Sequence, residues 1–374
     1  MTHLVLIGGG HAHVAVLSAL AGQSLPNLHL TVISPQAYQT YSGMLPGWLA
    51  GHYSLEECQI NLAPLVAAAQ GELILDKVIR LDANQQCLET ASGQTINYDL
   101  LSINSGSETA LPTNSASNLI PIRPLERLLT AWPHILNLAQ QDNYQLAVLG
   151  GGAAGIELAL AIQYAFQQKG TAAQVHLIAP KLLADHAPSV QQRVQRQLTQ
   201  AGVKVHSAKA SIENGVLFLE TGEAIQANQI IAATGAKAPT WLTASGLAVD
   251  SQGYIAVNAQ HQSCSHPNVF AAGDCSARED LNFGRSGVHA VYAGKVLAHN
   301  LPTFINQQSL QSYHPKKHSL YLLATGPKHA IASWGTWSAS GTWVWHWKNH
   351  IDQSFMRHYR MKTSPLLNPA EQQS

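Results

Sequence analysis

Two segments of the sequence, about 140 residues apart, pass from a short apolar strand through a glycine-rich turn into an apolar helix. The second, "QLAVLGGGAAGIELALAIQYAFQQKG", carries Gly150, Gly152 and Gly155 at the complete G-x-G-x-x-G spacing. In this spacing the first glycine permits a tight turn, the second lets a pyrophosphate approach the backbone, and the third lets the helix pack closely on the strand. The repeated unit therefore predicts an α/β chain with two Rossmann-like dinucleotide-binding domains.

The first segment, "LVLIGGGHAHVAVL", departs from this spacing. Gly8 and Gly10 occupy the first two glycine positions, but His13 stands where the third glycine is expected. The Cβ of His13 would push the helix away from the strand unless the neighbouring residues are small, and Ala12 and Ala15 are small. We therefore expect this unit to tolerate the substitution and to hold phosphate groups at Gly8 and Gly10.

His11 and His13 form an H-x-H pair for which three roles are open. A metal site is the first, but no cysteine or carboxylate lies nearby in the sequence to complete it, and we expect no metal. The second role is a hydrogen bond from either histidine to a cofactor phosphate, for which His11 is the candidate. The third role is structural, with the ring packed inside the protein.

Three further apolar runs end in small residues and glycine: "YDLLSINSGS", "NQIIAATGAKAP" and "NVFAAGDC". They bring Gly106, Gly235 and Gly273 to the ends of predicted strands, where a cofactor can approach the backbone closely. Asp274 follows Gly273 and would place a carboxylate where a sugar hydroxyl group can bind. Asp274 is therefore a candidate cofactor ligand, and the alternative is an ordinary turn aspartate after a buried strand.

Neither unit offers the usual carboxylate for an adenosine ribose. Folds of this kind commonly carry Asp or Glu at the end of the second strand. Here "LTVIS" ends in Ser34 and "VHLIAPK" ends in Lys181. Ser34 can still hydrogen-bond a hydroxyl group, and Lys181 would attract a 2′-phosphate. The sequence therefore leaves the choice between NADH and NADPH open.

Length and composition exclude several classes of protein. A chain of 374 residues exceeds one ordinary core, which fits two domains and an appendage. Its formal net charge of +0 argues against a nucleic-acid partner held by phosphate contacts. The first strand begins within three residues of Met1, which leaves no room for a secretory signal, and no apolar run is long enough to span a bilayer. We therefore expect a cytoplasmic protein.

The ordered motifs "GGGHAH", "NSG", "GGGAAGIE", "ATG" and "FAAGD" resemble those of the two-dinucleotide-binding-domain flavoproteins, the superfamily of pyridine nucleotide-disulfide oxidoreductases and type II NADH dehydrogenases. The resemblance covers roughly Leu4 to Asn300. It implies FAD and NAD(P)H as cofactors, with Gly8 and Gly10 at the FAD pyrophosphate and Asp274 at the FAD ribitol.

A narrower similarity is carried by "YSGMLPGWLAGHY", "APTWLTASGL" and "WKNHIDQSFM". These stretches are similar to the NADH-dehydrogenase-like module that is found alone or fused to selenide, water dikinase. In that group a histidine-rich turn is the usual variant of the first glycine motif. The similarity implies a functional link to selenide, water dikinase.

The resemblance also implies a division of the chain into domains. The FAD-binding domain is expected to be discontinuous, with residues 1–115 and 246–310, because "GYIAVN" and "NVFAAGD" are strands that return to complete it. The NAD(P)-binding domain, residues 116–245, is expected as an insertion. Residues 311–374 should form a small tryptophan-rich segment with a β-hairpin and a helix. The two main sheets should be mostly parallel, with a β-hairpin crossover.

Three residues receive catalytic roles from the resemblance. Glu157, two positions beyond Gly155, matches a helix glutamate near the nicotinamide and flavin that orients the carboxamide or relays protons. The alternative is a charge favoured at a helix N-terminus by the dipole alone. The helix starting near Gly287 should point at the flavin, which places His289 on the acceptor side unless it is an exposed helix histidine. Pro46 is expected in a loop that packs over the flavin ring.

The electron path is expected to bypass cysteine. Disulfide reductases pass electrons to a cysteine pair beside the flavin, and here that region holds Cys58 alone. We therefore expect hydride transfer from NAD(P)H to FAD, followed by electron transfer to a quinone-like acceptor. One alternative is a sulfide or selenide:quinone oxidoreductase, for which Cys264 and Cys275 are the only pair that could relay sulfur. The other is a flavin-containing NAD(P)H redox sensor with little turnover.

The C-terminal segment suggests contact with a membrane surface. Trp343, Trp345 and Trp347 alternate, so that a strand there would present all three rings on one face. An apolar residue then recurs every four positions from Ile351 to Tyr359, with basic residues around this stripe. Aromatic rings flanked by basic charge suit the interface of an anionic bilayer, here the inner face of the cytoplasmic membrane. The alternative is a tryptophan-rich hairpin that closes the flavin domain or forms a dimer contact.

Overall fold

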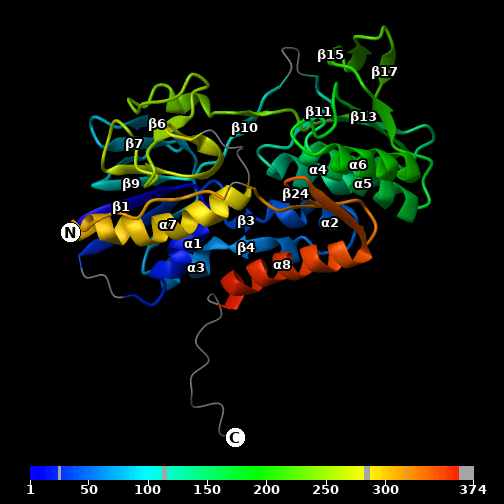
Figure 1. The fold of residues 1–374 in the computed structure, drawn as a ribbon. Coiled ribbons are helices and arrows are strands. Elements are labelled where there is room, and N and C mark those ends of the chain that lie inside the picture. The colour runs from blue at the N-terminus through cyan, green and yellow to red at the C-terminus, as the bar shows by residue number, and fades with distance from the viewer. Residues whose placement is uncertain (24–26, 112–115, 282–286, 317, 362–374) are drawn as a thin grey trace, which may run out of the picture.

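Two parallel β-sheets organise the protein, each with helices on its faces (Figure 1). The computed structural model describes residues 1–23, 27–111, 116–281, 287–316 and 318–361. The first sheet has the strand order β21-β9-β1-β2-β5, and the second has the order β11-β18-β12-β13-β14. Neighbouring strands are parallel throughout both sheets. This confirms the predicted α/β class with two Rossmann-like units.

The first sheet and its helices come from both segments of the predicted FAD-binding domain, residues 1–115 and 246–310, and this part is called the first half below. Its elements are β1 (Thr2–Ile7), α1 (His11–Leu20), β2 (Leu28–Ile33), α3 (Leu62–Ala68), β5 (Glu72–Ile74), β9 (Leu100–Ile103), β21 (Val269–Ala271) and α7 (Gly287–Ile305). Helix α1 is apolar nearly all round because it lies between this sheet and α7. The two helices approach closely where Gly294 faces Ala12 and Ala15, since a Cβ on Gly294 would lie 2.8 Å from the Cα of Ala12.

The second sheet lies entirely within residues 116–245. Its elements are β11 (Leu119–Pro121), α4 (Glu126–Leu138), β12 (Gln145–Leu149), α5 (Ala153–Gln168), β13 (Gln174–Ile178), α6 (Pro188–Ala201), β14 (Lys204–His206) and β18 (Gln229–Ala232). Helix α6 buries one stripe, Val190, Val194 and Leu198, as its periodicity predicts. The distribution of strands between the sheets is compatible with the predicted domain boundaries, which stay a prediction.

The part of the chain that forms each main sheet contains an antiparallel three-stranded insertion, which precedes β9 in the first half and β18 in the second half. In the first half it is an antiparallel sheet of β6 (Val78–Asp82), β7 (Cys87–Thr90) and β8 (Thr95–Asn97). In the second half it is β15 (Ala210–Glu213), β16 (Val216–Leu219) and β17 (Ala224–Gln226). The predicted β-hairpin crossover is therefore present in both halves.

Short strand pairs connect the remaining parts. They are β3 (Tyr38–Thr40) with β4 (Gln59–Asn61), β10 (Glu108–Thr109) with β19 (Ala236–Lys237), and β20 (Ile255–Val257) with β22 (Ser276–Arg278). The pair β10-β19 joins the chain that leaves the first sheet to the chain that leaves the second. The two main sheets are thereby tied together next to the glycine-rich ends of β9 and β18.

The C-terminal segment is an antiparallel sheet followed by a long helix, as predicted in outline. Its elements are β23 (Tyr321–Ala324), β24 (Ala330–Trp334), β25 (Trp337–Gly341) and α8 (Thr342–Met361). Figure 1 shows α8, in orange and red, beneath β4 and α2 (Leu45–Leu49) of the first half. The sheet packs instead on α5 and α6 of the second half, so that this segment bridges both halves.

The prediction of a strand carrying Trp343, Trp345 and Trp347 is wrong. Strand β25 ends at Gly341, and the three tryptophans lie in the first turns of α8. On a helix, residues four apart share a side whereas residues two apart do not. Trp343 and Trp347 therefore stack on each other in solvent, 55% and 37% exposed, while Trp345 is buried.

The helical stripe after these tryptophans is confirmed, but most of it faces the protein. Phe355 stacks on Tyr41 with 4.4 Å between ring centroids, and Tyr359 is buried beside it. Only Ile351 is exposed, on the side of Trp347. Phe355 and Tyr359 of the stripe therefore pack on the first half of the molecule, and a smaller aromatic surface stays exposed. The tryptophan-rich hairpin, which the alternative interpretation expected to close the flavin domain, packs instead on α6 of the second half.

Candidate cofactor and catalytic site

The first glycine turn is shaped by Asn104, which follows β9. Gly8 has φ +90°, and a Cβ there would lie 2.5 Å from the carbonyl oxygen of Asn104. A Cβ on Gly10 would run into the Asn104 side chain. Asn104 Oδ1 accepts the backbone N–H of Ala12 (3.1 Å), and its Nδ2 donates to the carbonyl of Ala272 (2.6 Å). Sequence reasoning did not single out Asn104, although the "NSG" motif contains it.

His13 has the structural role among those predicted. The ring is fully buried, its Nδ1 lies 2.6 Å from the carbonyl oxygen of Gly8, and its Nε2 lies 2.8 Å from Ser102 Oγ. Burial lowers the pKa of His13 to about 4, so the ring is neutral at pH 7. Because a carbonyl only accepts, Nδ1 carries the proton and Nε2 accepts the Ser102 hydroxyl. Both nitrogens are therefore used inside the protein, and His13 braces the turn in place of the missing glycine.

His11 differs from His13 in having an unused nitrogen. Its ring packs edge-on against Tyr41 (5.6 Å between centroids) at the start of α1, and its Nε2 is buried with no partner among the described residues. Burial lowers its pKa to about 4, and the Asp274 carboxylate opposes this shift. A buried polar atom without a partner is costly unless a bound group supplies one. The predicted contact between His11 and a cofactor is compatible with this geometry.

Asp274 lies in a turn directly after β21, where Gly273 has φ +78°. Its Oδ2 is 3.5 Å from Arg123 Nη2 and accepts the Ser107 hydroxyl at 3.4 Å. Arg123 comes from the link between β11 and α4, and sequence reasoning missed it because "PIRP" marks a crossover rather than a site. The adjacent Gly106 has open space around its Cα, with φ +73°. The carboxylate is thus half-exposed at the ends of β9 and β21, where its predicted sugar contact would be made.

The second glycine turn is narrow at two positions and open at the third. Gly150 has φ +126°, and a Cβ there would strike the backbone of Ala233. A Cβ on Gly155 would strike the carbonyl oxygen of Gly150. Only glycine therefore fits at this position, where α5 packs closely on β12. Gly152, at the N-cap of α5, and Gly235 have no atom within 4 Å of an added Cβ. Open space therefore lies in front of the α5 N-terminus, as a bound pyrophosphate requires.

Ser34 lies where it was predicted, directly after β2, but its hydroxyl is already bonded. Ser34 Oγ donates to the carbonyl of Gln36 (2.8 Å), and the side chain is buried. A ribose hydroxyl would therefore have to donate to this oxygen. Lys181 is exposed after β13. The ribose contact of Ser34 stays a prediction, and so does the choice between NADH and NADPH.

Glu157 is not an ordinary surface charge on α5. Its Oε1 accepts the backbone N–H of Ala324 in β23 at 2.8 Å, although the two residues are 167 positions apart. Burial raises the pKa of Glu157 to about 7, and the nearby Lys348 ammonium opposes the shift. A carboxyl group whose pKa lies near the working pH is suited to exchange a proton. Its contact with the nicotinamide stays a prediction.

Pro46 was expected in a loop, and that expectation is wrong. Pro46 is buried in the first turn of helix α2. Proline is favoured at the first position of a helix because its missing N–H would have no partner there. Its packing over the flavin ring stays a prediction.

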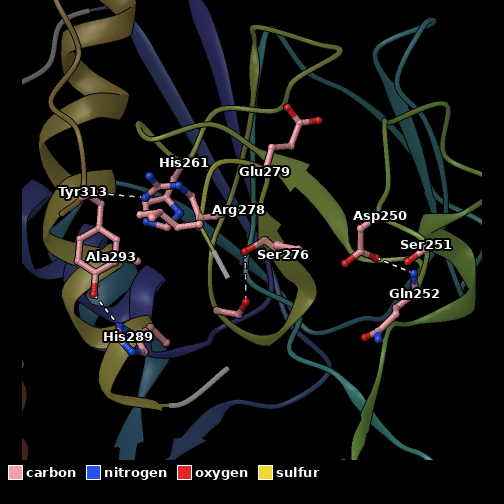
Figure 2. A pocket seen from close by; sticks show the side chains of 14 residues that line it. Asp250, Ser251, Gln252, His261, Ser276, Arg278, Glu279, His289, Ala293 and Tyr313 are labelled. Atoms are coloured by element: carbon pink, nitrogen blue, oxygen red, sulfur yellow. Dashed lines mark hydrogen bonds between the residues drawn. The ribbon is translucent and has the colours of Figure 1, made fainter. Parts of the chain in front are cut away.

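His289 lines a cavity of about 360 Å³ between α7, β22 and the loop at Asp250 (Figure 2). Its Nδ1 lies 2.8 Å from the Tyr313 hydroxyl, and burial lowers its pKa. Gly273 also lines this cavity, whereas Glu157 and Pro46 do not. The structure therefore places His289 and Glu157 in different environments, and the role of His289 on the acceptor side stays a prediction.

The residues present fit two dinucleotides. Each glycine turn precedes a helix whose N-cap is glycine, Gly10 in α1 and Gly152 in α5, so neither N-cap residue has a side chain that could cap its helix, although Asn104 accepts the N–H of Ala12 in α1. The first turns of these helices can therefore direct N–H groups at phosphate oxygens. In the first turn, the unpartnered His11 Nε2 and the half-exposed Asp274 carboxylate add a donor and an acceptor.

Comparisons with known proteins agree with this geometry. The sequence matches the family described as pyridine nucleotide-disulphide oxidoreductase over residues 2–295. It is 27% identical over 344 residues to ferroptosis suppressor protein 1 of Taeniopygia guttata, covering 88% of this chain and 87% of the relative. It is 24% identical over 298 residues to the large subunit of nitrite reductase (NADH) of Escherichia coli, covering 75% of this chain and 34% of that protein.

Two solved structures share the fold over almost the whole chain. The sulfide:quinone oxidoreductase of Aquifex aeolicus matches with a TM-score of 0.80 at 19% identity, covering 98% of this chain and 93% of that one. NDH2 of Plasmodium falciparum, solved with NADH, matches with a TM-score of 0.79 at 12% identity, covering 97% of each chain. At these identities the matches establish the fold alone.

Proposed function

The chain belongs to the pyridine nucleotide-disulphide oxidoreductase family, and we propose that it is an NAD(P)H dehydrogenase that passes electrons directly to a quinone-like acceptor. Family membership makes it a flavin-dependent oxidoreductase with FAD and NAD(P)H as cofactors. Bound FAD supplies a ring that accepts a hydride and releases two electrons. The chain's own residues would orient the two dinucleotides, with Gly8, Gly10 and Asp274 at FAD and with Gly150 and Gly152 at NAD(P)H.

The observation that carries the proposal is the state of the cysteines. All four are free thiols, and the one in the segment where a redox pair would be expected, Cys58, is buried. Burial raises the pKa of Cys58 to about 12, so it does not form a thiolate at neutral pH. Electrons therefore have no disulfide to enter and would leave the flavin for an external acceptor. The similarity to a sulfide:quinone oxidoreductase supports a quinone for that role.

The sulfide or selenide alternative would require Cys264 and Cys275 to carry sulfur. The Cys275 thiol is buried and donates to the carbonyl of Ala272 at 3.3 Å. Burial raises the pKa of both thiols to about 11. Sulfur relay needs thiolates that can attack, and these two groups are protonated at pH 7. The quinone-reducing dehydrogenase is therefore the better-supported function.

A variant without cysteine is expected to keep its quinone reductase activity. In this variant, Cys58 and Cys275 become alanine, which suits their buried sites, and Cys87 and Cys264 become serine. We expect kcat with NADH or NADPH and a soluble quinone to stay within about threefold of wild type, since small buried substitutions chiefly affect stability. Steady-state rates with equal FAD content provide the measurement. Loss of turnover with FAD retained would favour sulfur relay, and negligible turnover of both proteins would favour the redox sensor.

We also propose peripheral contact with an anionic membrane surface, through the exposed side of α8. Trp343, Trp347 and Ile351 are exposed on that side, one helical turn apart. Lys348, predicted to flank the apolar stripe, is instead buried, but Arg357 is exposed on the same helix. None of the described helices is long and apolar enough to cross a bilayer. A cytoplasmic location and a link to selenide, water dikinase stay predictions from the sequence.

Replacing Trp343, Trp347 and Ile351 together by glutamine is expected to reduce binding to anionic vesicles at least threefold, because tryptophan side chains favour the membrane interface. Co-sedimentation with phosphatidylserine-containing liposomes measures the bound fraction. The matched control replaces Trp334 and Trp337, which are exposed on the β24-β25 hairpin, and should bind as wild type does. Equal binding of wild type and the α8 variant would contradict the membrane contact.

A further inference from the structure

Helix α8 carries a buried ion pair that none of the assigned roles explains. Lys348 and Asp352 are 8% and 5% exposed, and the Lys348 ammonium lies 2.7 Å from Asp352 Oδ2. Taking two charges out of water costs several kcal/mol per ion unless further hydrogen bonds complete their shells. Such a pair is therefore weak evidence for a stabilising role alone. It needs further hydrogen-bond partners, and a functional role would explain why it is present.

The partners come from the segment that precedes α2. The Lys348 ammonium also donates to the carbonyl oxygen of Gly43 at 2.6 Å. The Tyr41 hydroxyl donates to Asp352 Oδ1 at 3.1 Å, and the Tyr41 ring stacks on Phe355 of α8. Asp352 thus accepts bonds on both oxygens and holds the ammonium in one place.

The segment that holds the pair packs against the helix that carries Glu157. Helix α2, which follows Gly43, packs through Leu45 and Leu49 on the core that includes α5, where Glu157 lies. The C-terminal segment reaches Glu157 a second time, through the N–H of Ala324. The Lys348 ammonium favours the charged form of Glu157, and the Asp352 carboxylate opposes it more weakly.

We propose that Lys348 and Asp352 form a charge pair that sets the protonation of Glu157, with Asp352 as the positioning residue that fixes the Lys348 ammonium. The inference deepens the proposed function, on which it rests in placing Glu157 beside the nicotinamide. Burial and this pair together leave the pKa of Glu157 at about 7. Small changes in the pair would therefore switch the carboxyl between its acid and its anion near neutral pH.

Three other titratable groups around this cluster stay uncharged at pH 7. Burial raises the pKa values of Tyr41, Tyr53 and Cys58, which keeps all three protonated. The His52 Nε2–H donates to the carbonyl of Gly326 at 2.7 Å. Lys348 and Asp352 are therefore the charged groups whose removal should move the Glu157 titration most.

The test compares two nearly isosteric variants of the FAD-loaded protein. Lys348→Met removes the cation and leaves Asp352, whose pKa burial raises. The stronger influence is lost, so the Glu157 midpoint should rise by at least about half a pH unit. Asp352→Asn removes the anion and leaves the ammonium bonded to Gly43, so the Glu157 midpoint should fall, by less than it rises in Lys348→Met. Infrared titration of the carboxyl C=O band, assigned by its loss in Glu157→Gln, gives the midpoint directly.

Opposite shifts in the two variants, with no shift in Arg357→Met on the exposed side of α8, would confirm the proposal. The pH inflection of flavin reduction by NAD(P)H should move in the same directions. Shifts of the same sign, or unchanged midpoints, would overturn it. Should Lys348→Met fail to fold, Tyr41→Phe provides the second arm: it removes one hydrogen bond that stabilises the Asp352 anion and should shift the midpoint as Asp352→Asn does, by less. Because the infrared midpoint needs no acceptor, the result stands even if no quinone is reduced.

Discussion

Replacing Gly152 by valine is expected to abolish reduction of the flavin by NAD(P)H while FAD stays bound. Gly152 has φ −76° and ψ 176°, which valine adopts without strain, and no atom lies within 4 Å of an added Cβ. The protein should therefore fold normally. The valine side chain would occupy the space in front of the α5 N-terminus, where the pyrophosphate of NAD(P)H is expected. We expect the rate of anaerobic flavin reduction to fall at least about 100-fold, the cost expected for a displaced reactant.

Gly152→Ala serves as the matched variant, since it adds only the Cβ and should give a smaller loss. Both variants should contain as much FAD as wild type, because Gly152 belongs to the second turn and not to the first. Wild-type reduction rates in Gly152→Val, with NADH and with NADPH, would show that the nucleotide does not bind at this turn. If Gly152→Val loses both its bound FAD and its reduction by NAD(P)H, the second turn would instead hold the flavin nucleotide.

Replacing Asp274 by alanine is expected to weaken FAD binding by about 10- to 100-fold. A hydrogen bond to a charged group contributes about 1.5–3 kcal/mol, and the Asp274 carboxylate is placed to accept one from the FAD ribitol. Its present partners, Arg123 and Ser107, lie at 3.5 and 3.4 Å and are both partly open to solvent. The fold should therefore survive the change. The ratio of flavin to protein absorbance after dialysis, followed by titration with FAD, measures the effect.

Asp142→Ala, in the exposed turn before β12, is the control for loss of one surface carboxylate. Asp274→Asn should fall between wild type and alanine, because the amide oxygen accepts a hydrogen bond but carries no charge. FAD affinity equal to wild type in Asp274→Ala would return Asp274 to the role of an ordinary turn aspartate paired with Arg123.

The parts of the fold that the sequence predicts are those set by short-range patterns. The glycine spacing at Gly150, Gly152 and Gly155 requires a strand, a tight turn and a helix in direct succession, and these elements are present. The stripe on α6 follows from the helical period alone. Ala12 and Ala15 were expected to let α1 pack closely on its strand, whereas the structure shows both of them facing Gly294 of α7, a contact that the sequence does not show.

The site could not be predicted where it depends on residues far apart in the chain. Tyr41 and Asp352 are 311 positions apart, and Ser102 reaches His13 across 89 positions. No repeating pattern in the sequence links such pairs, because the two residues meet only in the folded protein. The pairing of Arg123 with Asp274 is hidden for the same reason.

The tryptophan run shows how a local pattern can mislead. Alternation of Trp343, Trp345 and Trp347 fits a strand, but Gly341 with φ +146° ends β25 before them. Packing against β24 and His52 then favours a helix, which buries Trp345 and leaves the other two in solvent. Tertiary contacts therefore override the period of two.

The most direct test of the central claim is an anaerobic titration of the purified protein, followed by its visible flavin absorption. We expect one equivalent of NADH or NADPH to bleach the flavin of each chain, and one equivalent of a soluble quinone to restore it, in wild type and in the cysteine-free variant alike. Protein that shows no flavin spectrum after addition of FAD, or a flavin that neither nucleotide bleaches, would contradict an FAD-dependent NAD(P)H dehydrogenase. A bleached flavin that quinone leaves reduced would contradict the acceptor.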